Sequence, residues 1–291
     1  MTEPMEPLRF VSLRDHVTSG NVLLANGEEV DDPNLWAAVV VAARGSGFCT
    51  ASLIGPNVLL TAAHCVDAFD PQQPSRTVTG TVTIGGQTRA ISRCTMSAPY
   101  AAAQIPATDI PRSSEDFAVC EVGGNFSDMT FETLGATHVP VGTDLLLSGY
   151  GCTKIWIFAQ QLKSSIEGKR ALRIGQATVE ARNVLDASDA KGSYLRSRAE
   201  DDEPIVCPGD SGGPAFADAS LADQNGQRRV VAVNSKVTAV ADGGSYDYLS
   251  FLAPSSDAAF TRLLADWQAE SPVRRKVCGR DLAPGEQGCR E

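Results

Sequence analysis

The chain has 291 residues, a formal net charge of −10, a hydrophobic content of 43% and a charged content of 21%. These values are ordinary for a soluble globular protein with room for one large or two small domains around a full hydrophobic core. The acidic balance argues against a nucleic-acid-binding surface, which would be basic. The longest apolar run, residues 35–43, is too short to cross a bilayer, so we expect a buried strand there and no membrane span.

The N-terminus and the cysteines give opposite indications about the compartment. Residues 1–10 contain no apolar segment of the kind that a signal peptide needs. An even number of cysteines without a CxxC pair favours disulfide bonds and a secreted or periplasmic protein. We hypothesise that a leader is missing from this sequence or that export uses another route; a cytoplasmic protein with free thiols is the alternative. The eight cysteines are Cys49, Cys65, Cys94, Cys120, Cys152, Cys207, Cys278 and Cys289.

Short β-like runs separated by Gly, Pro, Asn and Asp recur along the chain. Many short strands with turn signals between them indicate an all-β protein, an antiparallel sandwich or barrel. Helices and strands do not alternate, which argues against a parallel α/β sheet. Residues 70–76, 101–114 and 186–203 are predicted surface loops. The predicted strands lie in 36–43, 57–63, 76–86, 116–122, 143–151, 171–181 and 228–235.

One helix is predicted, over residues 254–270. Ser255 or Ser256 can cap its N-terminus, and Asp257 lies in the first turn, where the helix dipole favours an anion. An amphipathic helix docked on a β body is the simplest interpretation. The apolar residues with the spacing of one helix face are Phe260, Leu263, Leu264 and Trp267.

The segment CPGDSGGP, Cys207–Pro214, places one serine among glycines directly after an acidic residue. A serine hydroxyl is a poor nucleophile unless a base removes its proton, and histidine is the usual base because its pKa lies near neutral pH. Of the three histidines, His16 lies in a polar N-terminal segment, His138 lies in a loop beside a proline, and His64 ends an apolar strand. Ser211 is therefore the candidate nucleophile, and His64 is the candidate base.

Two motifs carry a resemblance to a known family. TAAHC, Thr61–Cys65, and GDSGGP, Gly209–Pro214, strongly resemble the trypsin/chymotrypsin-like serine proteases. Phe48-Cys49, Ser148–Gly151 and the C-terminal helix extend the resemblance, which covers residues 24–268. It implies two six-stranded antiparallel β-barrels with a C-terminal α-helix, and a serine endopeptidase that works through an acyl-enzyme without a metal or organic cofactor.

The extent of the resemblance divides the chain. Residues 24–270 are the expected protease domain. Residues 1–23 are an N-terminal extension or propeptide, and residues 271–291 are a C-terminal extension in which Cys278 and Cys289 can form a disulfide clip. We expect a monomer whose partners are protein or peptide substrates.

Two other functions are weighed against proteolysis. A catalytically silent relative could serve as a binding module, but such relatives usually lack one of the three catalytic residues of the family. Candidates for all three, His64, Asp116 and Ser211, are present here. A serine esterase of another fold carries the serine in G-x-S-x-G and has the chain order Ser, acid, His. The residues around Ser211 do not match that window, and the serine comes last.

The resemblance implies a third catalytic residue between the histidine and the serine in the chain. Asp109 and Asp116 are the contenders. A proline two residues after Asp109 would interrupt a strand, whereas Asp116 opens a buried strand with the family's pattern of an Asp followed by alternating apolar residues and Ala. We assign Asp116. The backbone N–H groups of Gly209 and Ser211 are the expected oxyanion hole, where a side chain at 209 would obstruct the approach.

Asp210 has a separate role in this family, because its buried carboxylate pairs with a newly cut α-amino group. The nearest match to the family's mature N-terminus is Leu24–Gly27, and no basic residue precedes it. We hypothesise a precursor, or zymogen, that is cut by an activating protease of another preference. The alternative is a site that assembles without cleavage.

The resemblance also implies disulfide pairs. The family joins Cys49 to Cys65, and Cys94 and Cys120 lie in strands that should be neighbours. Many relatives pair the cysteine four residues before the nucleophile with one downstream, but none occurs between 207 and 278. Cys152 is the better partner for Cys207, because its loop flanks the oxyanion hole in this fold. Cys278 then pairs with Cys289.

The specificity pocket is placed by resemblance alone. Its floor falls on Ile205, followed by Val206, and its wall on the strand of Ser235, Lys236 and Val237, which should also bind the substrate backbone as an added strand. Ile205 and a pocket narrowed by Val237 favour a small or medium apolar residue before the cut. If Asp247 lies on the opposite wall, a basic residue is favoured instead.

Overall fold

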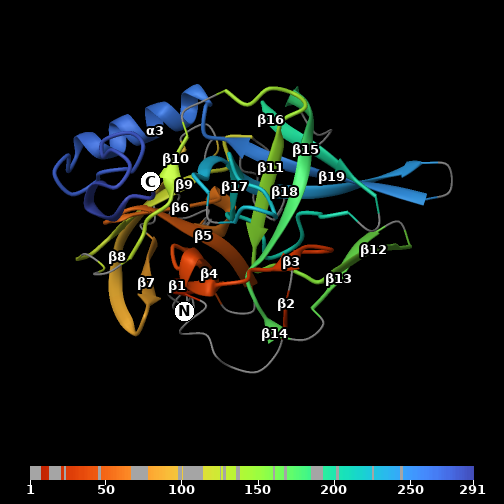
Figure 1. The fold of residues 1–291 in the computed structure, drawn as a ribbon, viewed down its shortest axis with the longest axis horizontal. Coiled ribbons are helices and arrows are strands. Elements are labelled where there is room, and N and C mark those ends of the chain that lie inside the picture. The colour runs from red at the N-terminus through yellow and green to blue at the C-terminus, as the bar shows by residue number, and fades with distance from the viewer. Residues whose placement is uncertain are drawn as a thin grey trace, which may run out of the picture.

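The structure is a computed structural model with two β-rich halves and one long helix (Figure 1). No helix in the described part of the chain is long and apolar enough to cross a membrane. The described residues are 8–12, 21–22, 24–44, 47–66, 78–97, 100, 114–124, 126, 129–135, 138–159, 161–166, 169–184, 193–200, 203–224, 226–242 and 245–291. The predicted loop at 70–76 and nearly all of the one at 101–114 therefore lie outside them.

The first half is a closed barrel. Its strands pair in the order β1-β4-β5-β6-β9-β8-β7. Their alternating side chains bury an aliphatic core that includes Val40, Leu53, Leu59 and Ile91. The strands are β1 (Leu8–Ser12), β4 (Val39–Arg44), β5 (Gly47–Gly55), β6 (Val58–Thr61), β7 (Val78–Ile84), β8 (Gln87–Met96) and β9 (Ala118–Val122).

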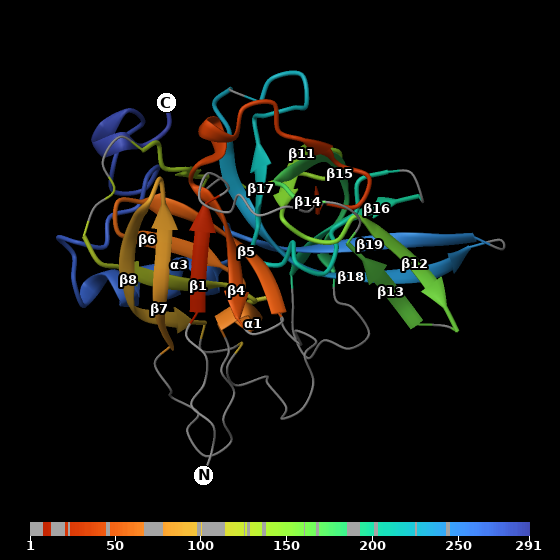
Figure 2. The ribbon, with the colours of Figure 1, turned by 90° about the horizontal axis from the view of Figure 1, so that it is seen from below.

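This barrel has one strand more than the six expected, because the N-terminal segment enters it. Strand β1 pairs antiparallel with β4 and parallel with β7 and lies between them (Figure 2). Its side chains alternate, so Leu8 and Phe10 are buried and Arg9 is exposed. Residues within the predicted N-terminal extension are therefore part of the barrel wall.

The second half closes in the same way. Six strands pair antiparallel in the order β18-β17-β11-β15-β16-β19, and β19 pairs again with β18, which completes the ring. The prediction of an all-β, chymotrypsin-like fold is confirmed. The prediction of a loop over 186–203 is wrong for β16. The strands are β11 (Asp144–Gly149), β15 (Arg173–Val184), β16 (Tyr194–Ala199), β17 (Pro214–Ala217), β18 (Arg229–Asp242) and β19 (Ser245–Pro254).

Short elements complete the two halves. Strands β3 (Glu28–Glu29) and β10 (Thr133–Leu134) attach to the second sheet, and β2 (Asn21–Val22) pairs with β14 (Lys169–Arg170). The hairpin of β12 (Lys154–Phe158) and β13 (Gln161–Ser165) projects on the same side as the tip of β18 and β19 in both views (Figures 1 and 2). The remaining elements are α1 (Ala63–Val66) and the 3-10 turns η2 (Pro33–Trp36) and η3 (Glu286–Gly288).

Helix α3 (Ala258–Ala269) is the predicted C-terminal helix, with a different cap. Asp257 is the N-cap, since its carboxylate accepts a hydrogen bond from the N–H of Ala259 at 2.7 Å. The hydroxyl of Ser255 points elsewhere and donates to the carbonyl groups of Gly135 and Val231. The predicted apolar face is buried, with Phe260, Leu263, Leu264 and Trp267 in the core.

The C-terminal extension is built into the molecule rather than appended to it. The N–H of Cys278 donates to the carbonyl of Ile54 in β5, and the carbonyl of Cys278 accepts from the N–H of Leu134 in β10. A disulfide joins Cys278 to Cys289. The extension is thus hydrogen-bonded to both halves of the protein.

A buried ion cluster fastens the end of the extension. The carboxylate of Glu132, which is fully buried, lies 2.6 Å from Nη2 of Arg228 and 3.1 Å from Nε of Arg290. The guanidinium of Arg228 also stacks 3.5 Å from the ring centroid of Trp36. Burial raises the pKa of Glu132, but the charges and hydrogen bonds of the two arginines outweigh it and bring the pKa below its usual range.

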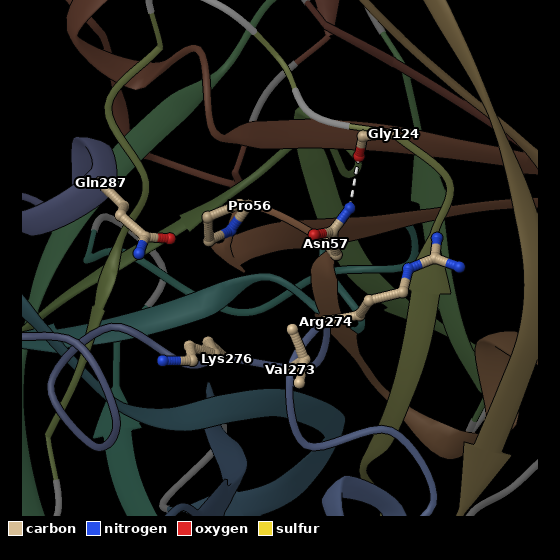
Figure 3. A pocket seen from close by; sticks show the side chains of 7 residues that line it. All are labelled: Pro56, Asn57, Gly124, Val273, Arg274, Lys276 and Gln287. Atoms are coloured by element: carbon tan, nitrogen blue, oxygen red, sulfur yellow. Dashed lines mark hydrogen bonds between the residues drawn. The ribbon is translucent and has the colours of Figure 1, made fainter.

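An open pocket of about 420 Å³ lies where the extension meets the turn that begins β6 (Figure 3). Arg274 and Lys276 give it a basic lining. The pocket lies at the start of β6, whereas His64 lies three residues after Thr61, the last residue of that strand. Its lining residues are Pro56, Asn57, Gly124, Val273, Arg274, Lys276 and Gln287.

Replacement of Arg228 tests the buried cluster, and the next residue provides a matched control. We expect Arg228→Met to lower the free energy of unfolding by about 3–5 kcal/mol, because Glu132 would lose a buried partner. Arg229→Met removes an ion pair with Asp218 whose two side chains are 48% and 47% exposed, so we expect a loss of less than about 1 kcal/mol. Chemical denaturation of both variants measures the difference. Equal losses would contradict a dominant role for the buried cluster.

Candidate active site

The three predicted triad residues come from the two barrels, where Asp116 contacts His64, and Ser235 contacts both Asp116 and Ser211. His64 lies on α1, the short helical turn directly after β6. Asp116 lies two residues before β9, which pairs with β6. Ser211 lies in the loop that leads into β17 of the second barrel. The order of the strands therefore brings together residues that are far apart in the chain.

The contact between His64 and Asp116 fixes the imidazole ring. Nδ1 of His64 lies 2.8 Å from Oδ2 of Asp116, and the backbone N–H of His64 donates to Oδ1 at 3.0 Å. The Asp116 side chain is fully buried, and the His64 side chain is 20% exposed. When Nδ1–H donates to the carboxylate, Nε2 is left unprotonated and can accept a proton.

Ser235 adds a third hydrogen bond to this carboxylate. Its hydroxyl donates to Oδ2 of Asp116 at 2.6 Å. The backbone carbonyl of Ser235 also accepts a hydrogen bond from the hydroxyl of Ser211 at 3.3 Å. Sequence reasoning predicted Ser235 only as a substrate-binding residue and missed its contact with Asp116. The buried carboxylate explains the polar side chain, because the charge of Asp116 needs donors.

Thr50, which sequence reasoning also missed, connects the first barrel to the nucleophile loop. Its N–H donates to the carbonyl of Ser211 at 2.7 Å, and its hydroxyl donates to the carbonyl of Gly209 at 2.9 Å. The same hydroxyl accepts from the N–H of Tyr150 at 3.0 Å. These contacts orient the peptide groups around Ser211. A threonine in an apolar strand gives no signal of this role in the sequence.

Gly209 has a backbone conformation that requires glycine. Its φ is +104°, and a Cβ at this position would lie 2.7 Å from Cα of Gly151. The loop therefore lies directly against the segment of Gly151. The assignment of the N–H groups of Gly209 and Ser211 as oxyanion donors stays a prediction.

Asp210 is fully buried between two segments of the second barrel. Its Oδ1 accepts from the N–H of Gly151 at 2.7 Å, and its Oδ2 accepts from the N–H of Cys207 at 2.9 Å. Burial raises the pKa of Asp210 well above its ordinary value, and the two amide hydrogen bonds offset only part of that rise. The carboxyl group is thus placed where a cationic partner would stabilise its charged form.

The segment that would form the mature N-terminus lies in the core of the second half. Leu24 and Ala25 are fully buried. Ala25 forms a β-bridge with Ile205, whose N–H donates to the carbonyl of Ala25 at 3.1 Å. This segment therefore packs beside the predicted floor of the specificity pocket.

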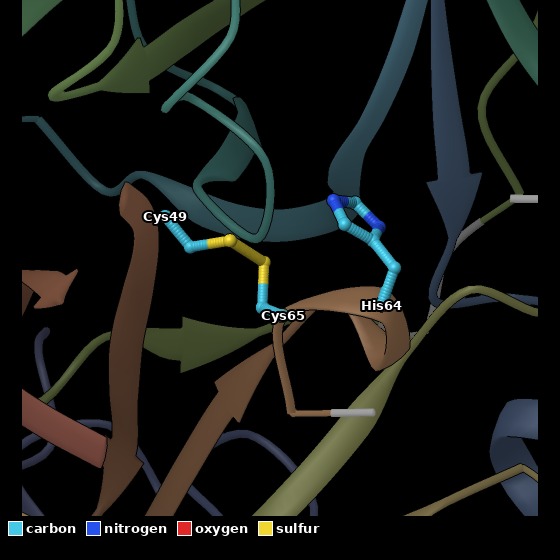
Figure 4. A group of neighbouring side chains, drawn as sticks. All are labelled: Cys49, His64 and Cys65. Carbon is cyan, nitrogen blue, oxygen red and sulfur yellow. A yellow bond between two sulfur atoms is a disulfide. The ribbon is translucent and has the colours of Figure 1, made fainter. Parts of the chain in front are cut away.

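Four disulfide bonds join the pairs that the resemblance implies: Cys49–Cys65, Cys94–Cys120, Cys152–Cys207 and Cys278–Cys289. Cys49, His64 and Cys65 form the one cluster within the described residues that has the composition of a metal site. Both of its sulfur atoms are joined in a disulfide (Figure 4), so they cannot serve as thiolate ligands.

The predicted pocket residues lie in an apolar environment. Ile205 and Val206 are buried, and Val237 packs against the cluster that contains Ile205. The N–H of Val206 donates to the hydroxyl of Ser250 in β19 at 3.1 Å.

Asp247 and Lys236, the two charged candidates, have other contacts. The carboxylate of Asp247 pairs with Arg198 at 2.5 Å. Lys236 is 8% exposed, and its Nζ lies 5.2 Å from the ring centroid of Tyr194 and 5.4 Å from that of Phe251. The ammonium group therefore interacts with two aromatic faces next to Ser235.

Among the rejected candidates, the structure describes His138 alone. His138 lies beside Arg182, with Nδ1 2.7 Å from Nη2. His16 and Asp109 lie outside the described residues.

Comparison with known proteins gives a family and a fold. The family model described as Trypsin matches residues 25–258. A solved structure titled "Structure of Glu endopeptidase in complex with MPD" is 16% identical in sequence and superposes with a TM-score of 0.53, covering 85% of this chain and 99% of that one. At this identity the likeness shows the fold alone, and no curated protein matches the sequence. The match over residues 25–258 places this chain in the trypsin family of serine proteases.

Proposed function

We propose that the chain is a serine endopeptidase that hydrolyses peptide bonds through His64, Asp116 and Ser211. The observation that carries the proposal is the contact of 2.8 Å between Nδ1 of His64 and the buried carboxylate of Asp116. A histidine held in this tautomer accepts a proton at Nε2, which is the property that activates a serine hydroxyl.

The reaction would proceed in two halves. Ser211 attacks the substrate carbonyl while His64 takes its proton, and the N–H groups of Gly209 and Ser211 stabilise the oxyanion. His64 then donates the proton to the leaving amine, and water releases the acyl group by the same route. Asp116 stabilises the imidazolium ion without becoming protonated.

We propose an apolar residue before the scissile bond. Ile205, Val206 and Val237 support this preference, because all three side chains are aliphatic and pack in apolar clusters. The alternative of a basic residue loses support, since the carboxylate of Asp247 is paired with Arg198. The Glu preference named for the structural neighbour is not carried over, because Ile205 offers no positive charge to a glutamate side chain.

The four disulfides fit an extracellular or periplasmic location, where such bonds persist.

We further propose that cleavage before Leu24 activates the enzyme and that strand β1 stays in the barrel afterwards. By family resemblance, the new α-amino group would pair with Asp210, whose buried carboxyl group has only amide donors among its hydrogen bonds within the described residues. Leu8 and Phe10 are 2% and 0% exposed, so their removal would expose the interior of the barrel.

Covalent labelling tests the proposed nucleophile. We expect a fluorophosphonate probe to add one label to Ser211 and none to the Ser211→Ala variant, as measured by intact mass. Asp116→Asn should slow labelling by about 10⁴-fold because the wrong tautomer of His64 is favoured. Asp144→Asn, at an exposed carboxylate, is the control with unchanged labelling. Absence of labelling before and after cleavage at residue 24 would favour the binding-module alternative.

The pH dependence of stability tests the state of Asp210. In the uncut chain we expect the free energy of unfolding to fall as pH rises above about 4, because the folded state keeps a proton that the unfolded state has released. Asp210→Asn should remove this fall. At low pH we expect the variant to be less stable than the parent, because an amide has only one acceptor oxygen for the two N–H groups that Asp210 binds. Cleavage before Leu24 should also remove it. Urea denaturation between pH 4 and 8 gives the curves, and identical slopes for the parent and Asp210→Asn would contradict the assignment.

A chain that begins at Leu24 tests the retention of β1. We expect its free energy of unfolding to be lower by at least about 3 kcal/mol, since the buried side chains of Leu8 and Phe10 are lost. A synthetic peptide of residues 1–23 should restore stability when added, whereas the same peptide with Phe10→Asp should not. Equal stability of the full and shortened chains would show that β1 is dispensable.

A further inference from the structure

The hairpin of β12 and β13 has two faces of different character. Side chains along β12 alternate between exposed and half-buried. Cross-strand partners share a face, so Trp156 stands beside Lys163 and Phe158 beside Gln161. Lys154 lies on the same side as these residues, one pair nearer the base. We call this side, made of Lys154, Trp156, Phe158, Gln161 and Lys163, the outer face.

The opposite side attaches the hairpin to the protein. Ile155 and Leu162 pack against the cluster that contains Ile205, Cys207 and Tyr248. Because these apolar contacts lie on the inner side, the outer face is directed away from the body. The hairpin is therefore a supported element whose outer face does not contribute to the core.

Large apolar side chains are unusually exposed on and beside this hairpin. Phe158 is 67% exposed and Trp156 is 37% exposed, and Ile166, directly after β13, is 47% exposed. These are three of the seven exposed large apolar residues among those that the structure describes. Aromatic side chains that are concentrated on one exposed face are a common feature of recognition surfaces.

The charge of the outer face is opposite to that of the whole chain. Lys154 and Lys163 are exposed, and residues 151–166 contain no Asp or Glu. The chain as a whole carries −10. A partner segment with acidic and apolar side chains would be attracted to this face.

The base of the hairpin is bonded to the loop of the candidate nucleophile. Cys152 forms a disulfide with Cys207, and the N–H of Gly151 donates to Asp210. A five-residue strand such as β12 spans about 16 Å, the length of about five residues of an extended substrate. A substrate segment of about five extended residues is therefore long enough to lie along β12.

We propose that the outer face is an exosite that binds an acidic segment with interspersed apolar residues in the polypeptide substrate. This inference rests on the proposed endopeptidase function and adds a substrate class to it. An anionic lipid surface is less favoured, because such binding usually needs four or more clustered cations and the chain carries a net negative charge.

Peptide binding to the inactive Ser211→Ala chain tests the exosite. The probes are fluorescent 15-residue peptides built from Glu-Glu-Phe repeats or from Lys-Lys-Phe repeats. We expect the acidic peptide to bind at least tenfold more tightly than the basic one. Trp156→Ser with Phe158→Ser, and separately Lys154→Gln with Lys163→Gln, should each weaken binding of the acidic peptide by about tenfold.

A matched control removes exposed apolar residues elsewhere. Val141→Ser with Val273→Ser alters side chains that are 58% and 83% exposed, and this variant should bind the acidic peptide within twofold of the parent. Unchanged thermal midpoints will show that the variants remain folded. Equal binding by the hairpin variants and the parent would overturn the exosite. So would hairpin-dependent binding to phosphatidylserine vesicles without any effect on the peptide.

Labelling with a fluorophosphonate separates this inference from the proposed function. In chains that retain Ser211, the hairpin variants should be labelled at the parental rate, because the probe is too small to reach the outer face. Slower labelling of those variants would overturn the exosite, since the hairpin would then act on the nucleophile itself. Absence of labelling in the parent chain, both before and after cleavage before Leu24, would contradict the proposed function, whereas the peptide measurements would still decide whether the face binds acidic segments.

Discussion

The buried carboxylate of Asp116 joins the two halves of the molecule. It accepts hydrogen bonds from the backbone and ring of His64 in the first barrel and from the hydroxyl of Ser235 in the second. A fully buried carboxylate is costly unless donors surround it, so both barrels must be correctly docked for the charge to be satisfied. Thr50 of the first barrel also joins the two halves, because it donates hydrogen bonds to the carbonyl groups of Gly209 and Ser211 in the second. The geometry at Ser211 is thus a consequence of how the barrels dock.

Glu132 imposes the same kind of constraint on the rest of the chain. It lies in the connection between the barrels, where its N–H donates to the carbonyl of Leu53, and its carboxylate is held by Arg228 and Arg290. Arg228 directly precedes β18, and Arg290 is the penultimate residue of the chain. One buried charge therefore couples the linker, the second barrel and the C-terminal extension. This explains why the extension is an ordered part of the fold rather than a tail.

The sequence predicted the parts of the fold that depend on local patterns. The apolar face of α3 follows from its spacing, and His64 and Ser211 follow from two short motifs. The contact between Ser235 and Asp116 was not predictable, because it joins residues 119 positions apart and a serine in a strand has many other uses. The sequence predicts a loop where β16 lies, because Tyr194–Ala199 mixes polar and apolar residues. The pairing of this strand with β15 and β19 outweighs that weak local preference.

Strand β1 was missed for a related reason. Five residues with two inward side chains give a weak periodic signal, and its place is set by the edges of β4 and β7. Unpaired edges are costly, and a short strand of modest propensity is enough to cover them.

The candidate site and its surroundings are under different physical constraints. A Cβ at Gly151 would lie 2.5 Å from Cγ of Asp210, and one at Gly209 would lie 2.7 Å from Cα of Gly151, so these positions tolerate no side chain. The outward side chains of β12 are exposed, so packing does not restrict them in this way. The disulfide between Cys152 and Cys207 links the constrained loop to the exposed hairpin, so a partner that binds the hairpin acts on an element that is covalently joined to the loop of Gly209 and Ser211.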